Sequence, residues 1–175
     1  MSEFLERERI RTEADAVVWS VNAAVQRNRV YRSYLGRAAF RAQWMGIIRE
    51  ESQKYRFAAE PVLDADHCQT IGAIAGRLSE AFAPLLRDGR LRFGTSQKAF
   101  NLYLKYLWQL GGLPRNLKPP HCPIDRIVLN ELSIDESWTK SDDQQQYMRW
   151  INAIRSRSQS IPDWENEVFL RRVSK

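Results

Sequence analysis

Residues 92–128 read RFGTSQKAFNLYLKYLWQLGGLPRNLKPPHCPIDRIV, and this is the most informative stretch of the chain. Apolar residues recur at helical spacing from Phe100 to Leu110, and a Gly-Gly pair and a proline follow them, which predicts a helix that ends there. A Thr-Ser pair near the start is suited to cap this helix. Because polar residues occupy only one narrow stripe of it, we expect the helix to lie at the centre of the protein.

The same periodicity recurs along the rest of the chain, so the predicted fold class is all-α. The expected helices are a long amphipathic one from Ile10 to near Arg27, then 40–55, 71–85 after the cap-like run 66–69, a short one after Pro123, one after the capping-box pattern of Ser141 and Gln144, and a last one from Ser160. Strand-like alternation is limited to residues 91–93.

Length and composition favour one compact multi-helix domain over residues 1–175. A chain of this length buries roughly 70% of its unfolded surface, which is enough for a complete core. The N-terminal residues show no signal-peptide pattern, and no apolar run approaches the roughly 18 residues that span a membrane. With only Cys68 and Cys122, neither a disulfide framework nor a four-cysteine iron–sulfur cluster is expected. We therefore expect a cytoplasmic protein with reduced thiols, no cofactor and no membrane partner.

Basic residues are concentrated in two segments. Residues 27–56 and residues 87–126 each contain eight basic and two acidic residues, so each segment has a net charge of +6, which equals the net charge of the whole chain. Phosphate contact requires such segments, because counterions released from nucleic acid supply most of the non-specific affinity. The same pattern is also compatible with two solvated arginine-rich faces.

The tryptophans are expected to be core anchors, because they are spread over nearly every predicted helix. They are Trp19, Trp44, Trp108, Trp138, Trp150 and Trp164. Trp164 lies in a C-terminal helix with the acidic residues Asp163, Glu165 and Glu167. We expect these carboxylates to dock against one of the basic segments, which would leave less basic surface for nucleic acid.

The only histidines and cysteines of the chain form two adjacent pairs, His67-Cys68 and His121-Cys122. Four such ligands would suit Zn²⁺ if the two segments met. The spacing argues against zinc, because adjacent residues of a helix point about 100° apart whereas paired zinc ligands are usually two to four residues apart. We therefore expect no metal, and a buried thiol beside a hydrogen-bonded imidazole in each pair.

Residues 87–128 predict a helix, a short turn containing Gly94, a second helix with Lys98 near its start, and a Pro-x-Asp junction at Asp125. This order of elements resembles the helix-hairpin-helix DNA glycosylase superfamily, and the resemblance covers about a quarter of the chain. It implies a hairpin-like DNA-contact element at 78–110, followed by a Pro-rich connector and an Asp-bearing helix at 111–132.

The resemblance implies a DNA-binding protein that acts as a DNA N-glycosylase or AP lyase on a modified base. Lys98 would attack the sugar and form a Schiff base at C1′, and Asp125 would stabilise the cationic sugar or activate the nucleophile. The residues implied to contact DNA are Arg90, Arg92, Phe93, Gly94, Thr95, Ser96, Lys105 and Arg126. The candidates for lining the base pocket are Tyr103, Trp108 and His121, with Trp44 as a further aromatic candidate.

Other interpretations remain open from the residues alone. Lys98 and Asp125 are equally ordinary as a surface lysine and a first-turn helix carboxylate. The protein would then be a non-catalytic basic helical module that binds nucleic acid or a partner protein within a larger assembly. A protein-interaction subunit with no nucleic-acid role is a third class.

Overall fold

The computed structural model describes residues 2–26 and 28–173. The regular secondary structure of these residues is helical, which confirms the predicted all-α fold class. The elements are α1 (Glu3–Glu8), α2 (Glu13–Val25), α3 (Arg37–Arg56), α4 (Asp64–Phe82), α5 (Phe93–Gln109), α6 (Arg126–Glu131), the 3-10 helix η1 (Trp138–Lys140), α7 (Gln144–Arg155) and α8 (Ile161–Val173). Within the described residues, β pairing is confined to an isolated antiparallel bridge between Tyr31 and Leu86. None of the helices described is long and apolar enough to cross a membrane.

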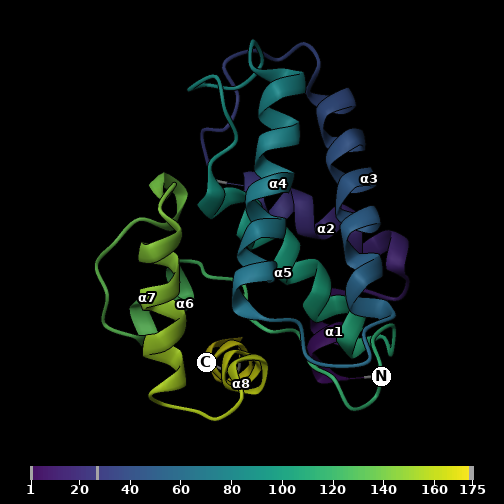
Figure 1. Ribbon diagram of the computed structural model, residues 1–175, viewed down its shortest axis with the longest axis vertical. Helices are drawn as coiled ribbons and strands as arrows, with labels where there is room; N and C mark the ends of the chain where they lie inside the picture. Colours follow the sequence, from purple (N-terminus) through teal and green to yellow (C-terminus); the bar gives the residue numbers. More distant parts are fainter. Residues whose placement is uncertain (1, 27, 174–175) are drawn as a thin grey trace.

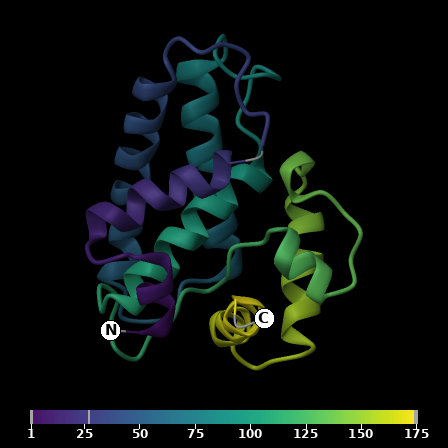
Figure 2. The same ribbon diagram turned by 180° about the vertical axis from the view of Figure 1, so that it is seen from behind.

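Helix α5 occupies the centre of the fold, as predicted (Figure 1). The helices α2, α3 and α4 pack against it, and η1 contacts it as well. In both views, α6, α7 and α8 lie together on one side of this group (Figure 2). Most residues of α5 are buried, so this helix contributes both apolar side chains and polar groups to the core.

The N-terminal segment forms two helices in place of the single helix expected from Ile10 onward. Arg9 has a φ of 57°, in the left-handed region, and ends α1. A capping box then starts α2: the Thr12 hydroxyl accepts from the Asp15 N–H, and the Asp15 carboxylate accepts from the Thr12 N–H. The end predicted near Arg27 falls on a residue outside the described ranges, and α2 itself ends at Val25.

Several other helix starts differ from the expected ones. Helix α4 begins at Asp64, so the cap-like run 66–69 lies inside it. Helix α7 is capped by Asp143, whose carboxylate accepts from the Gln145 N–H, and not by Ser141. The segment 91–93 forms no strand, because α5 begins at its last residue. Residues able to cap a helix recur within a few positions of each start, and periodicity alone does not choose between them.

Helix α8 docks on the central group through its acidic residues, as predicted. Glu165 Oε2 lies 2.6 Å from Lys105 Nζ, and Asp163 pairs with Lys118. Lys105 and Glu165 are both buried, and the ammonium group of Lys105 lies 3.7 Å from the centre of the Phe4 ring. Burial raises the pKa of Glu165, although the ammonium group opposes this shift. Two positive charges of the second basic segment are thereby paired with carboxylates of α8.

Most tryptophans are core residues, as predicted. Trp44, Trp138 and Trp150 are buried. Trp108 and Trp164 are partly buried and pack against the core. Trp19 is the exception, because about half of this residue is exposed on α2. The core is one hydrophobic cluster that extends from α1 to the start of α8.

Gly94 lies where α5 meets η1 at close range. A methyl group at this position would overlap the carbonyl oxygen of Trp138. We expect Gly94→Ala to lower the free energy of unfolding by about 1–3 kcal/mol, because η1 has to move. Gly46→Ala is the matched control, since nothing lies within 4 Å of the methyl group it adds in α3. The control should raise the free energy of unfolding by about 0.5–1 kcal/mol. Urea unfolding measures both, and equal effects would contradict the close contact.

Candidate functional site

The structure brings Lys98 and Asp125 together. Lys98 Nζ lies 3.1 Å from Asp125 Oδ2, and both side chains are mostly buried. The ammonium group also lies 4.8 Å from the centre of the Trp138 ring. The other carboxylate oxygen, Asp125 Oδ1, accepts from the N–H groups of Ile127 and Val128 and caps α6. The ion pair therefore ties α5 to the start of α6.

The turn implied to contact phosphate, residues 93–96, lies inside α5 and is buried. The Gly94 N–H donates to the Ser141 carbonyl at 2.9 Å. The Ser96 hydroxyl donates to the Ile71 carbonyl, and the Thr95 hydroxyl accepts from the Asn28 amide. Because these groups bond within the protein, this segment presents no exposed turn, and the helix-hairpin-helix element is not confirmed.

The charged residues implied to contact DNA are engaged in ion pairs. The pairs are Arg90–Asp142, Arg92–Asp142, Arg92–Asp88, Lys105–Glu165 and Arg126–Asp135, with distances between nitrogen and oxygen of 2.6–3.4 Å. Lys105 is also buried, which removes it from the surface. The charge of these residues is largely balanced within the protein, so little excess remains there to attract phosphate.

The residues implied to line a base pocket are buried or in contact with other side chains of the fold. Tyr103 is buried, and its hydroxyl donates to Glu13 at 2.6 Å. The centre of the Trp108 ring lies 5.6 Å from Lys118 Nζ. Trp44 and His121 are fully buried. The four side chains are thus accounted for by separate contacts within the fold.

His67 and His121 do meet, and their ring centres are 4.6 Å apart. Arg155 binds both carboxylate oxygens of Asp64, at 2.6 and 2.7 Å, and holds the pKa of Asp64 well below its usual range. This ionised carboxylate accepts from His121 Nε2 at 3.0 Å. The opposite nitrogen of the neutral ring, Nδ1, must then accept from the Tyr147 hydroxyl at 2.9 Å.

Asn101 of α5 continues this chain of hydrogen bonds. Its amide nitrogen lies 2.9 Å from the Tyr147 hydroxyl and 3.0 Å from the Cys122 carbonyl. Its oxygen accepts from His67 Nε2 at 2.8 Å, and His67 Nδ1 accepts from the Tyr55 hydroxyl at 2.7 Å. Both histidines are therefore buried in the neutral form with the proton on Nε2.

The cysteines do not join the histidines in a metal site. The Cys68 thiol lies 3.6 Å from the sulfur of Met148, and Cys122 is buried elsewhere in the core. Burial raises the pKa of both thiols. No cluster of His, Cys, Asp and Glu side chains that would hold a metal ion occurs within residues 2–26 and 28–173. The ring nitrogens of both histidines instead serve the hydrogen-bond network.

The loops that follow α2 and α4 lie side by side at the end of the molecule that is uppermost in Figure 1. The Arg32 N–H donates to the Leu85 carbonyl at 2.8 Å, and the Arg87 N–H donates to the Val30 carbonyl at 2.9 Å. The Arg32 guanidinium also donates to the Arg87 carbonyl at 3.1 Å. The two basic segments of the sequence therefore meet at this end.

A hollow of about 530 Å³ lies at this junction, and we call it the arginine hollow. It is lined by five arginines, Arg29, Arg32, Arg37, Arg41 and Arg87. Within the part of the chain that the structure describes, none of these five forms an ion pair with a carboxylate. Asp88, which follows Arg87, pairs with Arg92 instead. The arginine hollow therefore has an excess of positive charge.

Two tyrosines hold guanidinium groups of the arginine hollow in place. The Arg37 guanidinium lies 4.7 Å from the centre of the Tyr31 ring and 5.0 Å from the centre of the Tyr34 ring. Arg41 donates to the Tyr31 hydroxyl at 3.2 Å and to Asn22 Oδ1 at 3.1 Å. Guanidinium groups held over aromatic rings keep several N–H donors available for an anion.

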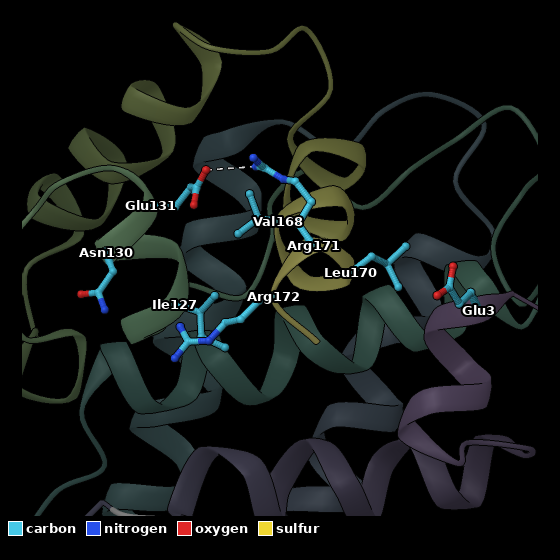
Figure 3. Close-up of a pocket in the computed structure, with 8 residues that line it drawn as sticks. All are labelled: Glu3, Ile127, Asn130, Glu131, Val168, Leu170, Arg171 and Arg172. Atoms are coloured by element: carbon cyan, nitrogen blue, oxygen red, sulfur yellow. Dashed lines mark hydrogen bonds and ion pairs between the residues drawn. The ribbon is translucent and has the colours of Figure 1, made fainter. Parts of the chain in front are cut away.

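A further hollow, of about 690 Å³, lies between α6 and α8 and reaches Glu3 of α1 (Figure 3). Its lining has charges of both signs. Glu131 and Arg171 form an ion pair of 3.0 Å across it, and Glu3 pairs with Arg7 at 2.8 Å. This hollow therefore lacks the charge excess of the arginine hollow.

Sequence reasoning counted these arginines within the basic segments but did not select them as site residues. The available signal is the run 28–41, NRVYRSYLGRAAFR, which has no acidic residue and places aromatic residues between basic ones. Basic and aromatic residues combined in this way are typical of contact with single-stranded nucleic acid. What the run does not reveal is which arginines find carboxylates elsewhere in the fold.

No protein-family model, curated protein or solved structure matches the chain. Two features of the structure could bind or react with a ligand. They are the arginine hollow and the ion pair of Lys98 with Asp125.

The buried histidines predict that acid destabilises the fold. Burial lowers the pKa of His121 to about 4, from an unfolded value near 6.5. Between pH 4 and pH 6.5 the unfolded chain binds a proton at His121 that the folded protein excludes. The contribution of His121 to the free energy of unfolding is therefore complete above about pH 6.5 and declines towards pH 4. We expect His121 to account for a loss of roughly 3 kcal/mol, and His67, whose pKa is also lowered by burial, to add to it.

Urea unfolding at a series of pH values measures the slope of the free energy of unfolding against pH. His121→Gln should reduce the slope between about pH 6.5 and pH 4 without abolishing it, because His67 remains. A slope that is the same in both proteins would show that His121 does not carry this dependence.

Proposed function

We propose that this protein binds the phosphate backbone of nucleic acid through the arginine hollow. The observation that carries the proposal is a single hollow lined by five arginines that have no carboxylate partner among the described residues. Two loops that are distant in sequence are hydrogen-bonded to each other to form it. Nucleic acid is also the partner that the basic segments predicted, but the proposed contact surface lies at the loops after α2 and α4 and not at the start of α5.

The charge of the arginine hollow favours a polyanion over a single small anion. Neighbouring guanidinium groups repel one another, and a ligand with several negative charges relieves this repulsion at several positions together. Each guanidinium has a planar set of donors that matches phosphate oxygens. A nucleic-acid backbone repeats phosphate along its length, and the counterions that it releases on binding supply the affinity.

Arg29 and Arg87 provide the direct test, because their side chains line the arginine hollow and have no hydrogen bond or ion pair within the described residues. In Arg29→Ala and in Arg87→Ala, the slope of log K against log salt concentration should become shallower by about 0.7–0.9. In the double variant it should become shallower by about 1.5. Fluorescence anisotropy of a labelled oligonucleotide over a range of salt concentrations measures the slope.

The matched control is Arg149→Ala, which removes an exposed arginine from α7, outside the arginine hollow. This variant should keep the slope of the unmodified protein. Equal losses in Arg149→Ala and in Arg29→Ala would mean that binding follows net charge and not the arginine hollow, and the proposed function would then fail.

The contact between Lys98 and Asp125 favours a second candidate function, that of an AP lyase. The Lys98 amine would condense with the C1′ aldehyde of an abasic site and release water, and borohydride would reduce the resulting imine to a stable covalent link. The burial of the pair and the capping of α6 by Asp125 favour a structural role for both residues.

Borohydride trapping on an oligonucleotide with an abasic site decides between these two roles. A lyase gives a covalent adduct that is absent in Lys98→Ala and present in Lys118→Ala, which removes another ion-paired lysine. A structural pair gives no adduct in any of the proteins, and Lys98→Ala then lowers only the free energy of unfolding.

A further inference from the structure

The arginine hollow adjoins a second hollow of different chemistry, and the two share Arg37 and Arg41. The second hollow has a volume of about 480 Å³ and is otherwise lined by Tyr34, Leu35, Gly36 and Ala38, so we call it the apolar hollow. The surface therefore changes from positive to apolar across two guanidinium groups. A ligand that fits both sides carries an anionic part next to a flat apolar part.

The apolar hollow is formed by side chains that project into solvent. Tyr34 is 81% exposed and Leu35 is 83% exposed. Gly36 follows with a φ of 88°, which other residues rarely adopt, and this turn leads directly into α3. A ligand that covers these two large apolar residues gains free energy by removing their surface from water.

We infer that the ligand is single-stranded nucleic acid, with its phosphates in the arginine hollow and a base stacked on Tyr34 in the apolar hollow. This inference rests on the proposed function and adds the strand state to it. The Arg37 guanidinium occupies one face of the Tyr34 ring, 5.0 Å from its centre. The exposure of Tyr34 leaves the other face available to a base.

A duplex does not satisfy both hollows. Its bases are paired and stacked in the interior, so that a protein contacts mainly phosphates and the edges of bases. In a single strand the bases turn away from the backbone and stack on aromatic side chains. A polyanion without bases would occupy the arginine hollow alone and gain nothing from Tyr34.

Three labelled probes of about 15 nucleotides test this inference by fluorescence anisotropy. They are a single-stranded DNA of mixed sequence, the same sequence as a duplex, and a single strand in which every base is replaced by an abasic tetrahydrofuran unit. We expect the single strand to bind about tenfold more tightly than the abasic strand, and also more tightly than the duplex.

Tyr34→Ala should weaken binding of the single strand about tenfold and leave binding of the abasic strand unchanged. Phe57→Ala is the matched control, because Phe57 is 82% exposed at the opposite end of α3. This control should change neither affinity. Both substitutions are at exposed positions, and circular dichroism checks that the helices are intact.

The outcomes separate the inference from the function on which it rests. If the single strand binds no more tightly than the abasic strand, or if Tyr34→Ala has no effect, the inference is overturned. A reduced salt dependence of binding in the Arg29→Ala and Arg87→Ala double variant would still support phosphate binding in that case. If none of the three probes binds, both the inference and the proposed function are overturned.

Discussion

The side-chain amide of Asn101 is the buried polar group on which the arrangement of the helices depends. It accepts from His67 of α4 and donates towards Tyr147 of α7 and towards the Cys122 carbonyl in the connector before α6. Each buried polar group left without a partner costs about 1–3 kcal/mol. Only an arrangement that brings all of these elements to the middle of α5 at once avoids this cost. Apolar packing holds the elements together, and the hydrogen bonds of Asn101 select which packing is adopted.

The hydrogen bonds that begin at Asn101 also reach α3, which contributes Arg37 and Arg41 to the arginine hollow. The Tyr55 hydroxyl, near the C-terminal end of α3, donates to His67 and so fastens this end of the helix to the core. Arg37 lies eighteen residues earlier in the same helix, which corresponds to about 27 Å along its axis. A helix is stiff over this length, so this hydrogen bond and the burial of Phe40 and Trp44 together position Arg37 and Arg41. The hydrogen bonds of the neighbouring loops then place Arg32 and Arg87 beside them.

Local signals in the sequence predicted the parts of the structure that depend on neighbours along the chain. Periodicity gave the main helices, and Asp125 after a proline gave the start of a short helix whose carboxylate also contacts Lys98. The hairpin was not obtained, because whether Gly94 forms a turn or enters a helix depends on η1, which lies more than forty residues later and packs on it. The ion pairing of the residues implied to contact DNA was not predicted for the same reason. The sequence shows that Arg90 and Arg92 are basic, but it does not show that Asp142 folds back onto both.

The distribution of acidic residues explains why the excess charge collects at one place. The second basic segment is balanced largely by carboxylates that follow it in the chain, at Asp135, Asp142, Asp163 and Glu165. The C-terminal half of the first basic segment is balanced by Glu13 and Glu51. No carboxylate of the described residues pairs with the arginines of the arginine hollow. The net charge of +6 is therefore not a property of the surface as a whole. Since internal ion pairs account for most other basic side chains, the arginine hollow is where an external anion gains most from binding.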